Sequence, residues 1–259
     1  MNPLNRRADY DQIAPTFDKR YERNAYAGVE RALREFIGNE RGLRILEAGC
    51  GTGHWLDILR SSGNYEIGLD YSTGMLARAR SSLPDMPLIR GTADHLPLPD
   101  ASLHRVFCIN ALHHFPDQPA FLAEVKRILR PRGRLLTVGL DPHRGLDRWH
   151  VYDYFPESLA IDKERFPASE VLRTWIAEAG FENCLTQEVD HWRIQVPARE
   201  ALAQGRLDKA ATSQLSVLSD EEYERGMQRL LADLQRAEEQ GQTLSLIVDL
   251  RLYGTTGSV

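Results

Sequence analysis

The stretch Ile45-Leu46-Glu47-Ala48-Gly49-Cys50-Gly51-Thr52-Gly53-His54-Trp55 decides how this chain folds. Residues 43–48 are a short apolar run, typical of a strand that is covered on both faces of a parallel sheet. Glycines then occupy alternate positions before an apolar helical pattern resumes at Trp55. Glycine allows positive φ angles and close approach of a ligand, and the start of the following helix favours a negative group. The stretch therefore predicts a strand, a glycine turn and a helix that form a ligand site, at which the Glu47 carboxylate could hold a positive group.

Length, charge and cysteine content exclude several classes of protein. The 259 residues can form one large domain with a sizeable core. A net charge of −5 argues against general nucleic-acid binding. The three cysteines are widely spaced with no CxxC pair, so we expect neither a disulfide framework nor a metal site, and a reducing cytoplasm as the setting. Residues 1–7 lack the apolar region of a signal peptide, and no apolar run approaches membrane-spanning length.

Residues 8–38, which precede the first strand, are predicted to be helical. The apolar residues of 29–37 recur at helical spacing, which predicts a helix packed on the sheet. Residues 10–21 carry aromatic side chains at mixed spacing. Two interpretations of that segment stay open: a partly exposed helix whose aromatic residues join the core, or a cap that closes over a ligand at the glycine turn.

The pattern after the glycine turn alternates strands and helices. A second strand, residues 65–70, ends in Asp70, and a carboxylate at that position can accept both hydroxyls of a ribose. Ser72 is a predicted N-cap for a helix over 73–81. The chain continues with predicted strands at 88–91, 106–110 and 134–140 and a helix at 120–129. Such alternation predicts a doubly wound, mostly parallel sheet with ligands at the carboxyl ends of the strands.

These residues together carry a resemblance to a known family. The chain resembles a class I S-adenosylmethionine-dependent methyltransferase of the kind that methylates small molecules. Its matching segments are Glu47–Gly53 (the first motif), Asp70 (the ribose-binding acid), Leu96–Asp100 (the third-strand loop), Leu129–Gly133 (the turn before strand five) and Tyr10–Ala14 (similar to the N-terminal cap of ubiquinone-type and natural-product members). The resemblance covers residues 8–140 in motif detail and most of the remainder in element order.

The residues themselves separate this site from a dinucleotide site. A dinucleotide fingerprint needs a third glycine three residues after the second, and that position is His54. The chain also lacks a second nucleotide-binding half. The resemblance implies S-adenosyl-L-methionine as cofactor and S-adenosyl-L-homocysteine as product.

The resemblance also implies which residues surround the cofactor. The methionine end is expected at Glu47 and Gly49, the ribose at Asp70, and the adenine between Tyr71 and the third-strand loop. That loop has Thr92 where many relatives have an acid, so Asp94 and the Ala93 backbone amide are alternative adenine partners. The full expected set is Tyr21, Glu47, Gly49, Cys50, Gly51, Gly53, Asp70, Tyr71, Met75, Thr92, Ala93, Asp94 and Asn110.

Methyl transfer asks the protein mainly to align a nucleophile, exclude water and, for oxygen or carbon nucleophiles, remove a proton. His113 and His114 follow strand four and are the candidate general bases; the alternative is that they pack the loop. His143, His150 and His191 are weaker candidates.

The acceptor is expected to lie beyond strand five. Residues 141–168 are rich in aromatic side chains, which form either an acceptor pocket or a small satellite core. The candidate acceptor-binding residues are Tyr10, Trp149, His150 and Tyr152. Ser169 is a predicted N-cap of the next helix, which ends at Gly180.

The last part of the chain predicts two strands with an insertion between them. Residues 183–196 and 243–253 are expected to form strands six and seven, matching the antiparallel edge hairpin that the resemblance implies. The insertion, 197–241, contains a capping box at Ser219–Glu222 and a helix with a leucine-rich face. Residues 206–218 could cover the acceptor site, whereas the leucine-rich face could instead form a dimer, so monomer and homodimer both stay open.

We therefore predict a seven-stranded α/β domain, residues 1–259, that acts as a methyltransferase on an O, N or C nucleophile of a small molecule. Its parts are a helical cap (1–40), a cofactor-binding core (41–140), a substrate-side segment (141–168) and the insertion. The expected acceptor is a natural product or aromatic metabolite, and neither nucleic acid nor a membrane is an expected partner. Two alternatives are a non-methylating enzyme that uses the same cofactor and a catalytically silent cofactor-binding regulatory subunit.

Overall fold

The computed structural model describes residues 8–23 and 26–259. The predicted lack of a signal peptide concerns residues 1–7, which lie outside the described residues. Within the described part, no helix is both long and apolar enough to cross a membrane.

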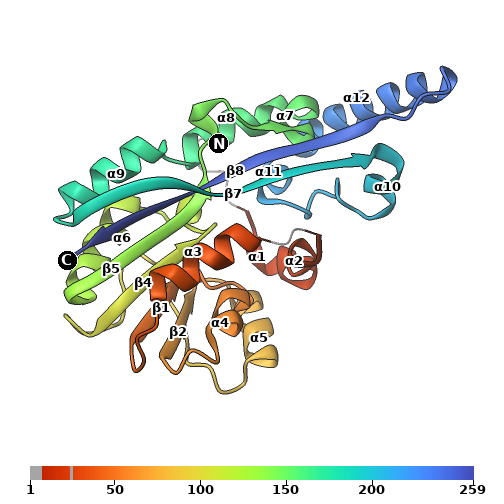
Figure 1. Ribbon diagram of the computed structural model, residues 1–259. Coiled ribbons are helices and arrows are strands. Elements are labelled where there is room, and N and C mark those ends of the chain that lie inside the picture. The colour runs from red at the N-terminus through yellow and green to blue at the C-terminus, as the bar shows by residue number, and fades with distance from the viewer. Residues whose placement is uncertain (1–7, 24–25) are drawn as a thin grey trace.

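A single twisted sheet forms the centre of the molecule (Figure 1). Its order is β3-β2-β1-β4-β5-β8-β6, and β7 pairs with the other edge of β8. The first five strands of this order are parallel, while β8 is antiparallel to β5, β6 and β7. The strands are β1 (Arg44–Ala48), β2 (Tyr65–Asp70), β3 (Leu88–Arg90), β4 (Leu103–Ile109), β5 (Leu129–Leu140), β6 (Arg148–Trp149), β7 (Glu182–Pro197) and β8 (Ser245–Ser258).

The predicted fold class is confirmed, with one strand more than expected. Short β6 was not predicted; it continues beside β8 where β5 ends, so the described sheet has eight strands. The antiparallel last strand and the helical insertion before it are both present. Strand β8 runs five residues past its predicted end at Tyr253, because its second half pairs with β5.

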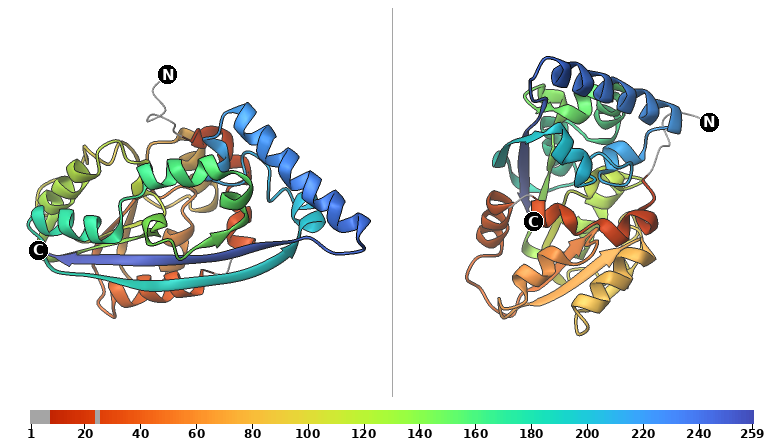
Figure 2. Two further views of the ribbon diagram at one scale, coloured as in Figure 1. Left: turned by 90° about the horizontal axis from the view of Figure 1, so that it is seen from above. Right: turned by 90° about the vertical axis from the view of Figure 1, so that its right-hand side faces the viewer.

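Helices cover both faces of the sheet. They are α1 (Tyr10–Ile13), η2 (Ala14–Thr16), α2 (Lys19–Arg23), α3 (Ala27–Ile37), α4 (His54–Leu59), α5 (Thr73–Ser82), η3 (Leu112–His114), α6 (Gln118–Ile128), η4 (Pro142–Arg144), α7 (His150–Tyr154), α8 (Pro156–Arg165), α9 (Ser169–Glu178), α10 (Ala198–Ala203), α11 (Ser213–Ser216) and α12 (Asp220–Glu239). In the left view of Figure 2, the long strands β7 and β8 separate α3 on one side from α8 and α9 on the other.

Alternation along the strands divides the core into two layers. Ile45, Phe107 and Leu136 face α3 and α4, whereas their neighbours Leu46 and Val106 face α6 and α9. Because successive strand residues point to opposite faces, a run of consecutive apolar residues can fill both layers. This explains why the strand before the glycine turn is almost entirely buried.

A third core lies under the half of the β7–β8 hairpin that adjoins the insertion. It joins the hairpin to α7, α10 and α12. Leu230 and Leu234 of the leucine-rich face are buried in it, whereas Leu231 is exposed. Much of that face therefore packs within the chain. In Figure 1, α12 lies alongside the end of the hairpin.

The predicted helix starts are partly right. The Ser72 side chain accepts the Met75 N–H, and Ser219 forms a capping box with Glu222. The prediction for Ser169 was wrong, because α9 is preceded by Ala168 and Ser169 is its first residue. Its hydroxyl and its backbone N–H instead donate to Asp141 Oδ2, at 2.6 and 2.8 Å, so an acid from the end of β5 caps this helix.

Candidate functional site

The glycine turn follows β1 at the carboxyl end of the sheet. Gly49, Gly51 and Gly53 have φ angles of +75°, +53° and +85°, a region that side chains rarely adopt. A Cβ on Gly49 would lie 2.4 Å from the Ala111 Cβ. The turn therefore needs glycine for its conformation and for its close approach to the loop after β4.

Asp70 is fixed beside this turn by two backbone donors. Its Oδ2 accepts the Gly51 N–H at 2.8 Å, and its Oδ1 accepts the Ser72 N–H at 2.8 Å. Burial raises the pKa of Asp70, and the two hydrogen bonds act in the opposite direction. The carboxylate thus stands, with its orientation fixed, where β1 and β2 both end.

Glu47 is a buried acid with an unsatisfied oxygen. It is 1% exposed, and its Oε2 has no hydrogen-bond partner among the described residues. Burial, together with the neighbouring charge of Asp70, raises its pKa well above the ordinary value. Leaving such a group unpaired costs free energy, so the site fits a ligand that brings a positive group or a hydrogen-bond donor.

The third-strand loop presents a second unsatisfied acid. Asp94 Oδ1 is buried and has no partner among the described residues, while a hydrogen bond from Thr92 lowers the pKa of Asp94. The Ala93 side chain is buried in the core. Tyr71, the other expected adenine neighbour, is 68% exposed, and its ring lies near the Arg90 guanidinium.

Three further expected cofactor residues have other surroundings. The Cys50 side chain is buried in the core, so only its backbone lies at the turn. Met75 is buried beneath Ile13 and Ala14 of the N-terminal segment. Tyr21 stacks on His54, with ring centroids 3.5 Å apart.

The N-terminal segment, residues 8–23, lies over this site. The Asp11 carboxylate accepts the Ser72 hydroxyl at 2.5 Å and the Gly74 N–H at 2.8 Å. Asp18 likewise accepts the Thr52 hydroxyl at 2.5 Å, and the Phe17 ring lies against Gly51. The segment is therefore tied to the glycine turn and to the start of α5, as a cap would be.

His113 and His114 form η3 after β4, and their surroundings differ. The Tyr10 hydroxyl of the cap is hydrogen-bonded to His114 Nε2 at 2.5 Å. His113 stacks on Phe166, with centroids 3.8 Å apart, and lines a pocket. Burial lowers the pKa of each imidazole well below the ordinary value, so both are neutral at pH 7.

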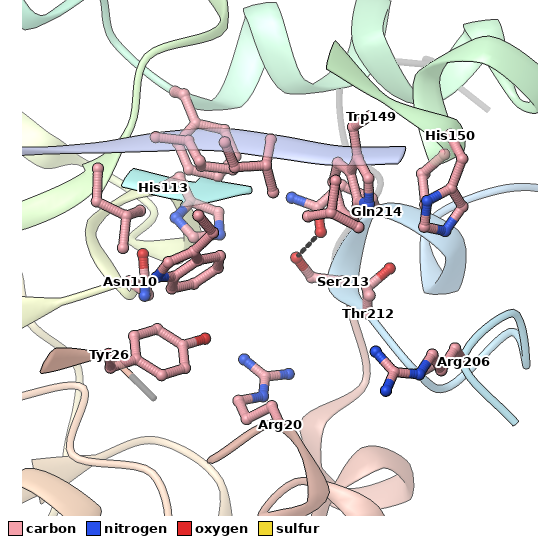
Figure 3. Close-up of a pocket in the computed structure, with 18 of the residues that line it drawn as sticks. Arg20, Tyr26, Asn110, His113, Trp149, His150, Arg206, Thr212, Ser213 and Gln214 are labelled. Atoms are coloured by element: carbon pink, nitrogen blue, oxygen red, sulfur yellow. Dashed lines mark hydrogen bonds between the residues drawn. The ribbon is translucent and has the colours of Figure 1, made fainter. Parts of the chain in front are cut away.

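That pocket has a cavity volume of about 160 Å³ and is partly open to solvent (Figure 3). Aromatic and apolar side chains line it together with several polar ones, a mixture that suits a small-molecule ligand. Of the expected acceptor residues, Tyr10, Trp149 and His150 line it; Tyr152 does not, and its hydroxyl donates to Asp162 Oδ2 at 2.8 Å. The expected cofactor residue Asn110, with φ of +52°, also lines it.

Among the weaker base candidates, only His150 lines the pocket. Its Nδ1 is hydrogen-bonded to the Ile247 carbonyl at 3.0 Å, which leaves Nε2 as the acceptor. His143 Nε2 lies 2.9 Å from the Phe166 carbonyl, and His191 pairs with Asp249 on the hairpin.

Several pocket residues were not expected from the sequence. They are Arg20 and Tyr26 in the N-terminal part, Phe166 after α8, Trp192 on β7, and Arg206 and Thr212–Gln214 in the insertion. The sequence pointed only to the residues of the insertion, because its irregular segment 206–218 was expected to cover the acceptor site. Nothing in the local spacing of Arg20 distinguishes it from the other basic residues of the cap.

Known proteins resemble this chain in sequence and in fold. Residues 46–137 match the family model of a methyltransferase domain. A phthiotriol/phenolphthiotriol dimycocerosates methyltransferase of Mycobacterium leprae is 37% identical over 140 residues, or 52% of this chain and 51% of that protein. The demethylmenaquinone methyltransferase of Renibacterium salmoninarum is 24% identical over 78% of this chain and 93% of its own length. For several curated relatives, including the Mycobacterium leprae protein, the matched part spans only about half of the relative's length or less.

Solved structures have a similar fold over most of this chain. A putative methyltransferase from an antibiotic biosynthesis pathway of Anabaena variabilis has a TM-score of 0.65, with 24% identity over 88% of this chain and 96% of its own. A phosphoethanolamine N-methyltransferase of Haemonchus contortus, in complex with S-adenosyl-L-methionine, has a TM-score of 0.58 and 18% identity over 90% of this chain and 52% of its own.

Proposed function

We propose that this chain, whose residues 46–137 match the family model of a methyltransferase domain and whose fold is that of the class I S-adenosylmethionine-dependent methyltransferases, methylates a small molecule. The methyl group would pass to an O, N or C nucleophile, with S-adenosyl-L-homocysteine as the second product. The observation that carries the proposal is the unpaired, buried Glu47 carboxylate beside Asp70 at the glycine turn.

Three acids of the site fit this cofactor. Glu47 would hold the ammonium of the methionine end, Asp70 the ribose hydroxyls, and Asp94 the adenine amino group. The glycine turn would leave the backbone bare beside the ligand. When bound, the cofactor supplies a sulfonium methyl group that is already electrophilic.

The residues of the chain would position the acceptor and keep water out. The apolar part of an acceptor would lie against Trp149, Trp192 and Phe166 in the pocket. The cap would cover the glycine turn and contribute Tyr10 to the same pocket. Alignment and exclusion of water are the main contributions that methyl transfer requires of a protein.

The two histidines after β4 would have different roles. His113 lines the pocket and is neutral, so it can take the proton that an oxygen or carbon nucleophile loses. His114 already shares its Nε2 with the Tyr10 hydroxyl, so we assign it a positioning role between the cap and the loop.

Calorimetry with S-adenosyl-L-methionine tests the proposal directly. We expect binding by the wild type, at least tenfold weaker binding by Asp70→Asn, and unchanged binding by Asp57→Asn, whose carboxylate is exposed and pairs with Arg60. Mass spectrometry of candidate acceptors would then show the gain of one methyl group. An absence of binding contradicts the whole proposal. Binding without methylation of any acceptor would favour a silent subunit, and a changed but unmethylated product would favour another reaction of the same cofactor.

The proposed division of labour between the histidines predicts different kinetics. His113→Ala should lower kcat by about 100-fold for an oxygen or carbon acceptor, a typical loss for a general base. It should also remove the acidic limb of the pH profile of kcat. His114→Ala should lower kcat less and leave that limb in place. Unchanged turnover in both variants would contradict general-base catalysis by this pair.

A further inference from the structure

Two arginines from separate parts of the chain enter the proposed acceptor pocket. Arg20 comes from α2 of the cap, and Arg206 from the segment between α10 and α11. In Figure 3 the Arg20 guanidinium points up and the Arg206 guanidinium points inward, both toward the open space below Ser213. The pocket therefore receives two positive charges from opposite sides.

The charges in this pocket are not balanced. Among the described residues that line it, none is an aspartate or a glutamate. Arg20 Nε is buried and has no hydrogen-bond partner among the described residues, although the guanidinium lies over the Phe17 ring at 3.7 Å. Arg206 Nε donates to the neutral Gln204 Oε1 at 2.6 Å. Each guanidinium therefore has N–H groups left for a ligand.

Other arginines of the chain behave differently. Arg165 pairs with Asp162 at 2.5 Å, although its Nε and Nη1 lack partners among the described residues, and Arg144 pairs with Asp141 at 3.2 Å. Buried or half-buried guanidinium groups normally find a carboxylate in this way, because an unpaired buried charge is costly. Arg20 and Arg206 depart from that pattern in the same cavity, which points to a ligand that supplies the missing anion.

Neutral donors lie beside the two arginines. Thr212 Oγ1 accepts the Leu215 N–H at 3.2 Å, so its own proton is free to point elsewhere. Thr212 and Ser213 both line the pocket, where the Ser213 hydroxyl donates to Gln214 Oε1 at 3.2 Å (Figure 3), so Thr212 is the hydroxyl left for a ligand. Guanidinium groups with neighbouring hydroxyls are a common recognition set for carboxylate and phosphate groups.

We infer that the acceptor carries an anionic group, a carboxylate or a phosphate, that Arg20 and Arg206 hold while its apolar part lies against Trp149 and Trp192. This inference rests on the proposed function, since it names the chemical class of the acceptor. It requires the cap to contribute to acceptor recognition as well as to covering the glycine turn.

A matched pair of fluorescent probes tests the inference without knowledge of the acceptor. Anilinonaphthalene sulfonate is an apolar aromatic anion, and phenylnaphthylamine has the same ring system without the sulfonate. In titrations of the ligand-free chain we expect the anionic probe to bind at least about tenfold more tightly than the neutral one. Arg20→Gln and Arg206→Gln should each remove about tenfold of the anionic probe's affinity and leave the neutral probe unchanged.

Controls separate local recognition from general charge. Lys19→Gln removes one positive charge from the exposed side of the same helix, and Arg199→Gln removes one that pairs with Glu238 in the insertion. Neither should change the ratio of the two affinities. Arg20→Lys keeps the positive charge and should restore part of the preference for the anionic probe. That recovery would show that the weaker binding of the anionic probe by Arg20→Gln is not due to a folding defect.

Competition distinguishes the two anions. Displacement of the probe by phenyl phosphate or by benzoate identifies the favoured group, and uncharged benzamide should displace it poorly. Equal affinity for the two probes, absence of binding by both, or an unchanged ratio in the arginine variants would overturn the inference. Calorimetry with S-adenosyl-L-methionine reports separately on the proposed function, because the proposed cofactor partners are Glu47, Asp70 and Asp94 and not the two arginines.

Discussion

The proposed cofactor side and the proposed acceptor side of this molecule are built in different ways. The cofactor side uses one continuous part of the chain, from β1 to the loop after β4, and much of its geometry is backbone: positive φ angles at glycines and N–H groups that fix Asp70. The acceptor side takes side chains from the cap, the loop after β4, the segment after β5, the insertion and the hairpin. A continuous backbone site leaves a motif in the sequence, whereas a site assembled from distant side chains does not.

Gly49→Ala should have the largest effect on stability and cofactor affinity, because it distorts the backbone of the glycine turn. The new Cβ would lie 2.4 Å from the Ala111 Cβ at a φ of +75°. We expect destabilisation of about 2–4 kcal/mol from overpacking and left-handed strain. Cofactor affinity should fall by more than about 100-fold, because a 1 Å displacement of ligand groups has effects of that size.

Gly139→Ala is the matched control for that substitution. Gly139 lies in β5, and a Cβ there would meet nothing within 4 Å. Chemical denaturation and calorimetry of both variants give the two quantities. If Gly49→Ala binds the cofactor as the wild type does, the backbone of the turn does not define the site.

Glu47→Gln should change stability and cofactor affinity in opposite directions. The ligand-free chain leaves Glu47 Oε2 unpaired in the core, so removing its charge should raise the melting temperature. The same change removes the partner of the cofactor's ammonium, and we expect about 100-fold weaker binding. Glu66→Gln is the control, because Glu66 is also buried but accepts the Ser62 hydroxyl at 2.7 Å; it should lower stability and leave cofactor affinity unchanged.

The pH dependence of stability follows from the same carboxyl. The folded-state pKa of Glu47 is raised above its ordinary value of 4.5, so between these two values the folded chain binds more protons than the unfolded chain. The stability of the ligand-free protein should therefore fall as pH rises from about 4.5 through the folded-state pKa. Urea unfolding against pH should show a smaller fall in Glu47→Gln. A fall of the same size in both proteins would assign it to other groups, such as Asp70, whose pKa is also raised by burial.

The fold was predictable from the sequence because its signals are local. Alternating apolar runs, the glycine turn and the N-cap at Ser72 each depend on neighbouring residues, and they gave the order of strands and helices. The exceptions depend on distant partners. Strand β6 exists only because β8 lies beside it, and Ser169 was misassigned because the acid that caps its helix is Asp141.

The same distinction applies to the site. The acids at Glu47 and Asp70 were expected from motifs, and Asp94 as one of two alternatives where the chain departs from the family pattern; the structure shows that Glu47 Oε2 and Asp94 Oδ1 lack partners among the described residues. Arg20 and Arg206 were not expected, because 186 residues separate them and only the folded chain brings them to one pocket. Tyr152 lies in the expected aromatic segment but does not line the pocket, and its hydroxyl donates to Asp162 Oδ2.

Asp11→Ala should have a moderate effect on both sides at once, since the cap touches both. It removes the acceptor of the Ser72 hydroxyl and of the Gly74 N–H. Because Asp11 is exposed, we expect only about a three- to tenfold loss of cofactor affinity, with a similar rise in the KM of the acceptor. Asp57→Ala, which removes an exposed acid from α4, should change neither. A loss confined to one of the two ligands would show that the cap serves only that side.

Ser219→Ala should have the smallest effect, limited to stability. Its side chain accepts the Glu222 N–H at the start of α12, and the Glu222 carboxylate accepts the Ser219 N–H in return. Losing half of a capping box costs about 1 kcal/mol. Glu222→Gln keeps the reciprocal bond and should be nearly neutral. The buried face of α12 packs into the hairpin core rather than against the glycine turn, so calorimetry should find the cofactor affinity of Ser219→Ala unchanged. A weaker affinity would mean that the insertion and the cofactor side are coupled, and that the two sides of the molecule are not independent in their energetics.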